Sequence, residues 1–194
     1  KFMGSGMLPA GAYVTLEHLT DNSEEKVLSD FGIMLWGNLN FSYNEATMGY
    51  HENNKSNFGA ISYLSRGWDE PHLVGYMESH DEERLMYKNL EYGNASGAYD
   101  IKELNTALAR MGLAGAFFFT VPGPKMIWQF GELGYNYSID DPCRVCNKPI
   151  RWDYNEGLRK EIYQVWASLI ELRKSEEAFR SDDFRLSVAG PGKR

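Results

Sequence analysis

The sequence predicts an α/β fold organised around a parallel sheet. Strand-like apolar runs and amphipathic helical segments alternate about four times along the 194 residues. Each predicted strand ends in polar residues, and each predicted helix is apolar on one side, which is typical of βα units. Because a complete eight-stranded α/β barrel needs roughly 250 residues, this pattern allows an open doubly wound sheet or half of a closed barrel.

The first unit begins with the β-branched run Ala12–Leu16, which is expected to be a strand. It ends in Glu17 and His18. A helix should follow, with Asn22 or Ser23 as its N-cap and acidic residues in its first turn. The first unit therefore brings a carboxylate and an imidazole to the end of a strand.

The second and third strands are predicted at Ile33–Gly37 and Leu73–Met77. The second leads into a polar and aromatic loop, Asn38–Asn44, and then into a helix whose bounds the Asn and Gly content obscures. The third has the nearly continuous apolar character of a strand that is covered on both faces.

A long helix is predicted after Asp100, where a residue pattern like a capping box ends at Glu103. Prolines and a glycine at 122–124 end it and lead into a strand, Lys125–Phe130. A final helix, Glu156–Lys174, should be capped by Asn155. Beyond it, residues 181–194 are expected to form a tail or the start of a further element.

Composition narrows the classes of partner. The formal charge of −7, with no basic run, argues against a nucleic-acid partner. No apolar run reaches about 18 residues, so no membrane partner is predicted. Cys143 and Cys146 form a single Cys-x-x-Cys in a polar loop, without a second pair or a nearby His, so we expect two loop thiols, free or bridged, and no metal site.

The candidate site lies after the third strand, where Glu78–Arg84 holds six ionisable groups in seven positions. Loops after the C-terminal ends of parallel strands carry the chemistry of such folds. We assign Glu82–Arg84 to the scaffold and His80 and Asp81 to the site. Glu17, 64 positions earlier, ends another strand and should reach the same face. A carboxylate pair of this kind suits glycoside hydrolysis, but spacing alone equally allows helix caps or salt bridges.

Four segments, in order, resemble the C-terminal half of the catalytic barrel of the α-amylase family of glycoside hydrolases. Tyr13-Val-Thr-Leu-Glu17 resembles the family's fifth strand, and Met77-Glu-Ser-His-Asp81 resembles its seventh. The run from Pro122 to Gly134 resembles the eighth strand, and Lys148-Pro-Ile-Arg-Trp-Asp153 the loop before the eighth helix. The resemblance implies a partial TIM barrel of about four βα units, spanning residues 9–180, with residues 1–8 as a linker or cloning remnant.

The resemblance implies roles for two carboxylates in a retaining reaction on α-linked glucans, namely starch and maltooligosaccharides. Glu17 would be the acid/base and Asp81 the stabiliser of the transition state. The substrate-binding candidates are His80, His18, Trp36, Asn38 and Tyr135, although core packing is the better expectation for Trp36.

The family's nucleophile is an aspartate of the fourth strand, and no such segment precedes Glu17. The isolated chain is therefore expected to be inactive. Glu45, Glu52 and Glu132 are spare carboxylates whose context suggests no substitute nucleophile. The alternative is a non-catalytic carbohydrate-binding or interaction module derived from such a barrel.

The resemblance also sets expectations for partners and setting. The expected partners are an α-glucan oligosaccharide, the missing N-terminal half of the barrel, and further copies of the chain, because half a barrel leaves strand edges unpaired. No cofactor is expected in this chain, whereas calcium is possible in the parent enzyme. An extracellular, periplasmic or cell-surface setting is favoured over the cytoplasm.

Overall fold

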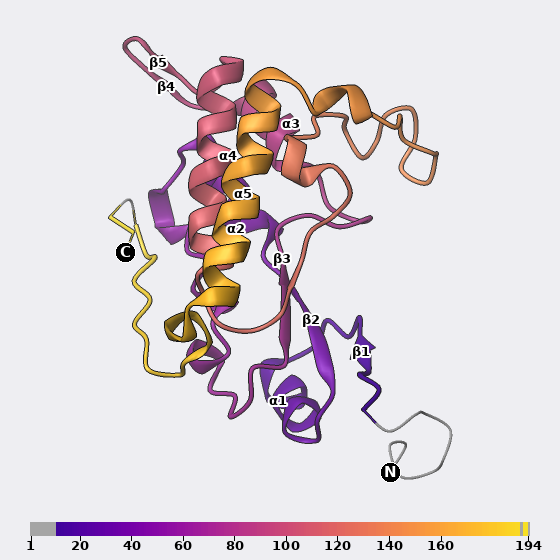
Figure 1. Ribbon diagram of the computed structural model, residues 1–194, viewed down its shortest axis with the longest axis vertical. Coiled ribbons are helices and arrows are strands. Elements are labelled where there is room, and N and C mark those ends of the chain that lie inside the picture. Colours follow the sequence, from indigo (N-terminus) through magenta and orange to yellow (C-terminus); the bar gives the residue numbers. More distant parts are fainter. Residues whose placement is uncertain (1–10, 191, 194) are drawn as a thin grey trace.

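The structure is a computed structural model that describes residues 11–190 and 192–193, so the expectation for residues 1–8 lies outside the described part. It confirms an α/β fold with a four-stranded parallel sheet and helices packed against it (Figure 1). The strands of the sheet are β1 (Thr15–Leu16), β2 (Met34–Asn38), β3 (Leu73–Tyr76) and β6 (Lys125–Met126). The α-helices are α1 (Asn22–Asp30), α2 (Asn40–Met48), α3 (Leu85–Tyr92), α4 (Leu104–Phe119) and α5 (Gly157–Ser175).

The strands lie in the order β1-β2-β3-β6, all parallel, so the sheet follows the order of the chain. Leu35 of β2 pairs with Leu16 on one side and with Leu73 on the other. Gly75 of β3 pairs with Lys125 of β6. This sequential order is that of consecutive strands in a (β/α)8 barrel, and it leaves the outer edges of β1 and β6 without a strand partner among the described residues.

The helices α2 to α5 pack together as one layer, and α4 and α5 run side by side (Figure 1). The main core lies within this layer and includes Leu85, Met111 and Phe118. Gly115 allows the close approach of α5, because a Cβ at this position would lie 2.4 Å from the indole nitrogen of Trp166. That nitrogen donates a hydrogen bond to the carbonyl of Met111 at 3.0 Å.

Along each strand, successive side chains point to opposite faces of the sheet, so one set faces the helices and the other faces away from them. Leu35 and Leu73 are fully buried, in a second core with Trp68. Trp36 and Val74, which pair with each other on the opposite face, are only half-buried. That opposite face corresponds to the side that lines the interior of a closed barrel.

Several elements differ from the sequence prediction. The fourth strand is two residues long, because the chain turns at Trp128 and forms a 3-10 turn at Gly131–Leu133. A short antiparallel hairpin of β4 (Ala95–Ser96) and β5 (Tyr99–Asp100) was not predicted. Residues 181–190 contain no helix or strand, and Val188 packs into the main core. No helix of the described residues is long and apolar enough to cross a membrane.

Lys125 is a half-buried cation on the helix side of β6. Its ammonium donates to the carbonyls of Gly123 at 2.9 Å and Pro122 at 3.3 Å, and no carboxylate contacts it within the described part of the chain. Burial, and to a smaller extent the positive charge of Arg173, lower the pKa of Lys125 to about 7. Folding therefore disfavours the protonated form of this side chain.

Lys125→Met is expected to raise the free energy of unfolding below pH 7, by on the order of 1–3 kcal/mol. Because the folded-state pKa lies below the unfolded value of 10.5, the unfolded chain binds more protons between these two values. The wild-type chain gains stability as the pH rises through this window, so the advantage of the variant should shrink towards pH 10. Urea unfolding at pH 6, 8 and 10 measures this. The control Lys160→Met removes an exposed cation of α5 and should show no such trend.

Candidate active site at the strand ends

Glu17, His80 and Asp81 converge at the C-terminal ends of β1 and β3. Nε2 of His80 lies 3.9 Å from Oε1 of Glu17 and 3.5 Å from Oδ2 of Asp81. One ligand atom from each residue falls within 4.8 Å of the others. All three side chains are about half exposed, so the cluster is open to a ligand. Parallel pairing causes the convergence, because β1 and β3 flank β2 and end at the same edge.

The loop after β3 is fixed by short-range contacts. Ser79 is buried, and its hydroxyl donates to Oε2 of Glu82 and accepts from the backbone amide of Asp81 at 3.1 Å. Oε1 of Glu82 accepts from the amide of Asn38 at 2.6 Å. Glu82 thus ties the tip of β2 to the loop that carries Asp81, as the scaffold assignment expects.

Glu82 also lies 3.4 Å from the hydroxyl of Tyr76. Burial and then the negative charge of Glu82 raise the pKa of Tyr76 well above its usual value. The tyrosine therefore stays protonated and serves as a donor beneath the site.

A buried ion pair supports the same loop from below. Nη1 of Arg84 lies 3.2 Å from Oε2 of Glu78, and both side chains are at most 5% exposed. Oε1 of Glu78 accepts from the backbone amide of Leu85 at 2.8 Å, which satisfies one free amide at the start of α3. Burial raises the pKa of Glu78, and the charge of Arg84 opposes this rise.

The predicted sugar-binding residues lie in different surroundings. Trp36 is half-buried and packs edge to face against Tyr76 and His80, with ring centroids 5.4 and 6.0 Å apart. Asn38 is exposed at the tip of β2, with its amide held by Glu82. Both lie close to the cluster.

Tyr135 does not lie at the site surface, so its predicted role in sugar binding is wrong. Its side chain is 1% exposed, and its ring stacks on Phe130 with centroids 5.6 Å apart. Its hydroxyl donates to the carbonyl of Pro149 at 2.6 Å, and Arg84 lies over its ring. With both faces and the hydroxyl occupied, Tyr135 packs the loop that follows β6.

His18 is not brought into the cluster either. Its Nε2 lies 2.9 Å from Oε1 of Glu24, in the first turn of α1. Neighbouring side chains along an extended chain point in opposite directions, which separates His18 from Glu17.

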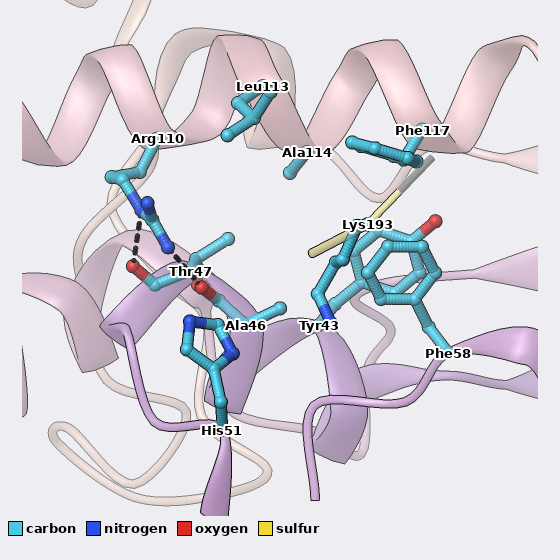
Figure 2. Close-up of a pocket in the computed structure, with 10 residues that line it drawn as sticks. All are labelled: Tyr43, Ala46, Thr47, His51, Phe58, Arg110, Leu113, Ala114, Phe117 and Lys193. Carbon is cyan, nitrogen blue, oxygen red and sulfur yellow. Dashed lines mark hydrogen bonds between the residues drawn. The ribbon is translucent and has the colours of Figure 1, made fainter. Parts of the chain in front are cut away.

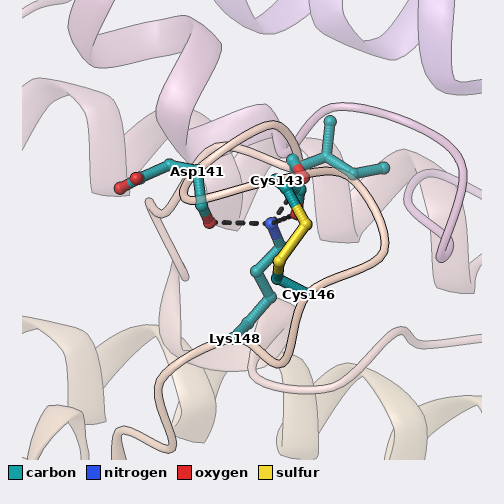
Figure 3. The surroundings of a disulfide bond; sticks show 5 residues. Asp141, Cys143, Cys146 and Lys148 are labelled. Atoms are coloured by element: carbon teal, nitrogen blue, oxygen red, sulfur yellow. Dashed lines mark hydrogen bonds between the residues drawn. A yellow bond between two sulfur atoms is a disulfide. The ribbon is translucent and has the colours of Figure 1, made fainter.

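A disulfide loop that sequence analysis did not assign to the site borders Asp81. Cys143 and Cys146 are bonded to each other, so the two thiols left open by the sequence are bridged (Figure 3). The ammonium of Lys148 donates to the carbonyls of Asp141 at 2.7 Å and Cys143 at 2.8 Å and to a third at Ile139. These bonds fold the loop around a single cation.

Arg144 extends from this loop to the site. Its guanidinium donates to the carbonyl of Asp81 and lies 3.9 Å from Oδ1 of the same residue. The loop is also anchored by Glu83, which lies just before α3. Oε1 of Glu83 accepts a hydrogen bond from the backbone amide of Ile139 at 2.9 Å. In the sequence, the feature that comes nearest to predicting this arrangement is the cysteine pair. It is compatible with a closed loop but does not indicate where that loop lies.

A cavity of about 540 Å³ separates the loop from the strand ends. His80 and Asp81 line one side, Trp128 and Gln129 another, and Arg144 the loop side. The volume falls within the range of small-ligand sites. A ligand here would contact the two groups after β3 and the polar rim of the loop together.

The cluster contains donor types that also bind metal ions. Among the described residues, Glu17, His80 and Asp81 form the one group of three such side chains that meets a metal-ligand spacing. Half-exposed carboxylates beside a histidine equally suit hydrogen bonding to sugar hydroxyls. We assign no metal to them.

The chain therefore has the fold of consecutive βα units of a (β/α)8 barrel, with a polar cluster at the C-terminal ends of its strands. No protein-family model matches the sequence, and no curated protein matches it either. Solved structures do match. The chain resembles the type III pullulan hydrolase from Thermococcus kodakarensis at 22% identity and a TM-score of 0.64, over 92% of this chain and 30% of that one.

Two further structures give the same result. A cyclomaltodextrinase matches at 20% identity with a TM-score of 0.57, over 92% of this chain and 28% of its own. The α-amylase from H. orenii matches at 16% identity with a TM-score of 0.53, over 91% and 38%. The chain thus has the fold of part of these α-glucan hydrolases, and it spans about a third of their length.

Proposed function

We propose that the chain is the C-terminal half of the catalytic barrel of a retaining glycoside hydrolase that acts on α-linked glucans. The convergence of Glu17, His80 and Asp81 at the ends of two parallel strands carries this proposal. It is supported by the fold shared with a pullulan hydrolase, a cyclomaltodextrinase and an α-amylase. The sequence resemblance that placed these same residues on the fifth and seventh strands agrees with it.

In the proposed reaction, Glu17 protonates the leaving glycosidic oxygen and later accepts a proton from water. Asp81 and His80 bind ring hydroxyls, and these bonds strengthen as the sugar ring flattens towards the transition state. The carboxylates of Glu17 and Asp81 are about half exposed, and the cavity beside Asp81 leaves room for a sugar ring.

The nucleophile of the proposed reaction comes from outside the described residues. Glu45 is paired with Lys55 at 3.0 Å, and neither it nor Glu52 or Glu132 joins the cluster at the strand ends. The proposal therefore assigns the nucleophile to the other half of the barrel. It places no cofactor in this chain and assigns any calcium to that remaining part of the enzyme.

The isolated 194-residue chain is expected to release no reducing sugar from maltoheptaose, because it supplies an acid and a stabilising carboxylate without a nucleophile. The measurement is a reducing-end assay at high enzyme concentration, with a complete α-amylase as the positive control. Turnover that depends on Glu17 in the isolated chain would contradict this division of the site.

Binding without turnover would have a different meaning in a longer protein that carries both halves. There, glucan binding that tolerates Glu17→Gln and is never followed by hydrolysis would favour the alternative, a carbohydrate-binding module. The observation behind this alternative is that two carboxylates, rather than three, converge in the part of the chain that the structure describes.

Self-association is expected for the isolated chain. The outer edges of β1 and β6 expose unpaired backbone groups, and the sheet face with Trp36 and Val74 is half-buried. Such edges pair readily with other strands. Light scattering at micromolar concentration should give a mass above the 22.2 kDa of one chain, and a clean monomer would contradict the expectation.

A further inference from the structure

A second cavity lies between α2 and α4, in the helix layer, and takes no part in the proposed reaction (Figure 2). Its volume is about 200 Å³, which suits a ligand no larger than one ring with a short substituent. One wall is aromatic. Tyr43 and Phe58 stack with centroids 4.4 Å apart, and Phe117 packs edge to face on Phe58 at 5.6 Å.

The opposite wall is basic. Arg110 of α4 donates through Nε to the carbonyl of Thr47 at 3.0 Å and through Nη2 to that of Ala46, the last turn of α2 (Figure 2). These two bonds hold the guanidinium at the cavity, and its Nη1 amino group has no hydrogen-bond partner among the described residues. A guanidinium that is held in place and still has free N–H donors is suited to binding a carboxylate.

Two more basic groups line the same cavity. Nδ1 of His51 lies 2.8 Å from the hydroxyl of Ser56, and no other described residue forms a hydrogen bond with Nε2. The ammonium of Lys193 is held by the carbonyls of Val188 and Gly190 and by Ser56, and lies over the ring of Phe58. Burial lowers the pKa of His51, and the charges of Lys193 and Arg110 lower it further, which indicates a positive local potential.

Among the residues that the structure describes, none with a carboxylate side chain lines the cavity. The nearest acidic side chains along the chain are Glu45 and Glu52, and both pair with Lys55, at 3.0 and 3.7 Å. The positive charge of the basic wall is therefore not neutralised by the described residues around it.

We propose that this cavity binds a small organic anion with one flat apolar ring, of the aryl carboxylate class. The carboxylate lies against Arg110 and His51, and the ring lies against the wall formed by Phe58 and Phe117. The carboxylate and the ring of such a ligand each find a matching wall in one cavity, which neither a glucan nor an inorganic anion would use fully.

The test uses phenylacetate and its neutral isostere phenylacetamide, titrated into the 194-residue chain by isothermal calorimetry at low salt. Phenylacetate should bind saturably at one site per chain, at least tenfold more tightly than phenylacetamide. Equal binding of the two probes, or no saturable binding of phenylacetate, would overturn the proposal.

Three variants locate the site. Ala114→Phe fills the cavity from α4 and should abolish binding, while Arg110→Met should weaken it at least tenfold. Lys102→Met removes an exposed cation just before the same helix and should leave binding unchanged. Circular dichroism checks folding, and if Ala114→Phe fails to fold, Arg110→Met and the amide probe decide. Phenylacetate binding that Arg110→Met leaves unchanged would overturn the assignment.

Discussion

Under the proposed function, replacing Glu17 by Gln in a protein that carries both halves of the barrel is expected to lower kcat on maltooligosaccharides by about 10²- to 10⁴-fold. The amide keeps the shape of the side chain but cannot protonate the leaving oxygen. Because ground-state contacts to the sugar remain, KM should change much less than kcat. Steady-state kinetics on maltoheptaose measure both constants.

A substrate with a better leaving group separates the acid role from a structural one. Fluoride leaves without general-acid assistance, so Glu17→Gln should retain far more of its glycosyl-transfer step on an α-maltosyl fluoride. The matched control is Glu24→Gln, which removes an exposed carboxylate of α1 that pairs with His18. If Glu17→Gln and Glu24→Gln behave alike on both substrates, Glu17 is not the acid.

Replacing Arg84 by Met is expected to destabilise the chain by about 3–5 kcal/mol, because it leaves the carboxylate of Glu78 buried without its counter-charge. Both side chains are almost completely enclosed and lie 3.2 Å apart. The loss should appear as a lower urea midpoint at pH 7, with the slope of the transition little changed.

A second substitution tests the cause. Glu78→Gln removes the buried charge and can still accept from the backbone amide of Leu85. Glu78→Gln combined with Arg84→Met should therefore recover much of the loss. Lys26→Met, which breaks exposed pairs with Asp30 and Asp69, should cost less than about 1 kcal/mol. A cost for Arg84→Met as small as that for Lys26→Met would contradict the argument.

The four strands of the parallel sheet could be predicted from the sequence, because each begins as a short apolar run that ends in polar residues. The helix starts could not. The predicted caps at Asn22, Asp100 and Asn155 are displaced by one or more residues, and the observed N-caps are Asp21, Glu103 and Glu156. Asn22 shows the reason, since its side chain donates to the distant carbonyl of Arg66. This tertiary hydrogen bond takes up the side chain that would otherwise cap the helix.

The predicted apolar faces of the helices were also broader than the buried ones. Leu104 and Leu113 of α4 and Leu158 and Val165 of α5 are at least 41% exposed. Hydrophobic periodicity records the faces of a helix without saying which neighbour covers each one.

At the site, the meeting of Glu17 with His80 and Asp81 followed from parallel strand ends, and the structure brings the three together. Tyr135 and Arg144 could not be placed in this way. Both lie in the long region between β6 and α5, where no periodicity relates sequence to position. An aromatic ring in such a loop can pack in the interior or stack on a sugar. The sequence also does not say which residue an arginine in such a loop contacts.

The shortness of strand β1 affects how the proposed site would become active. The backbone of Asp81 is held by Ser79 and Arg144, whereas Glu17 follows a two-residue strand that is paired on one side only. Within the described residues no hydrogen bond fixes the Glu17 carboxylate, and its nearest partner is His80 at 3.9 Å. In the proposed enzyme, a strand that pairs with the outer edge of β1 would bring the nucleophile and order Glu17 together, so that assembly itself would activate the site.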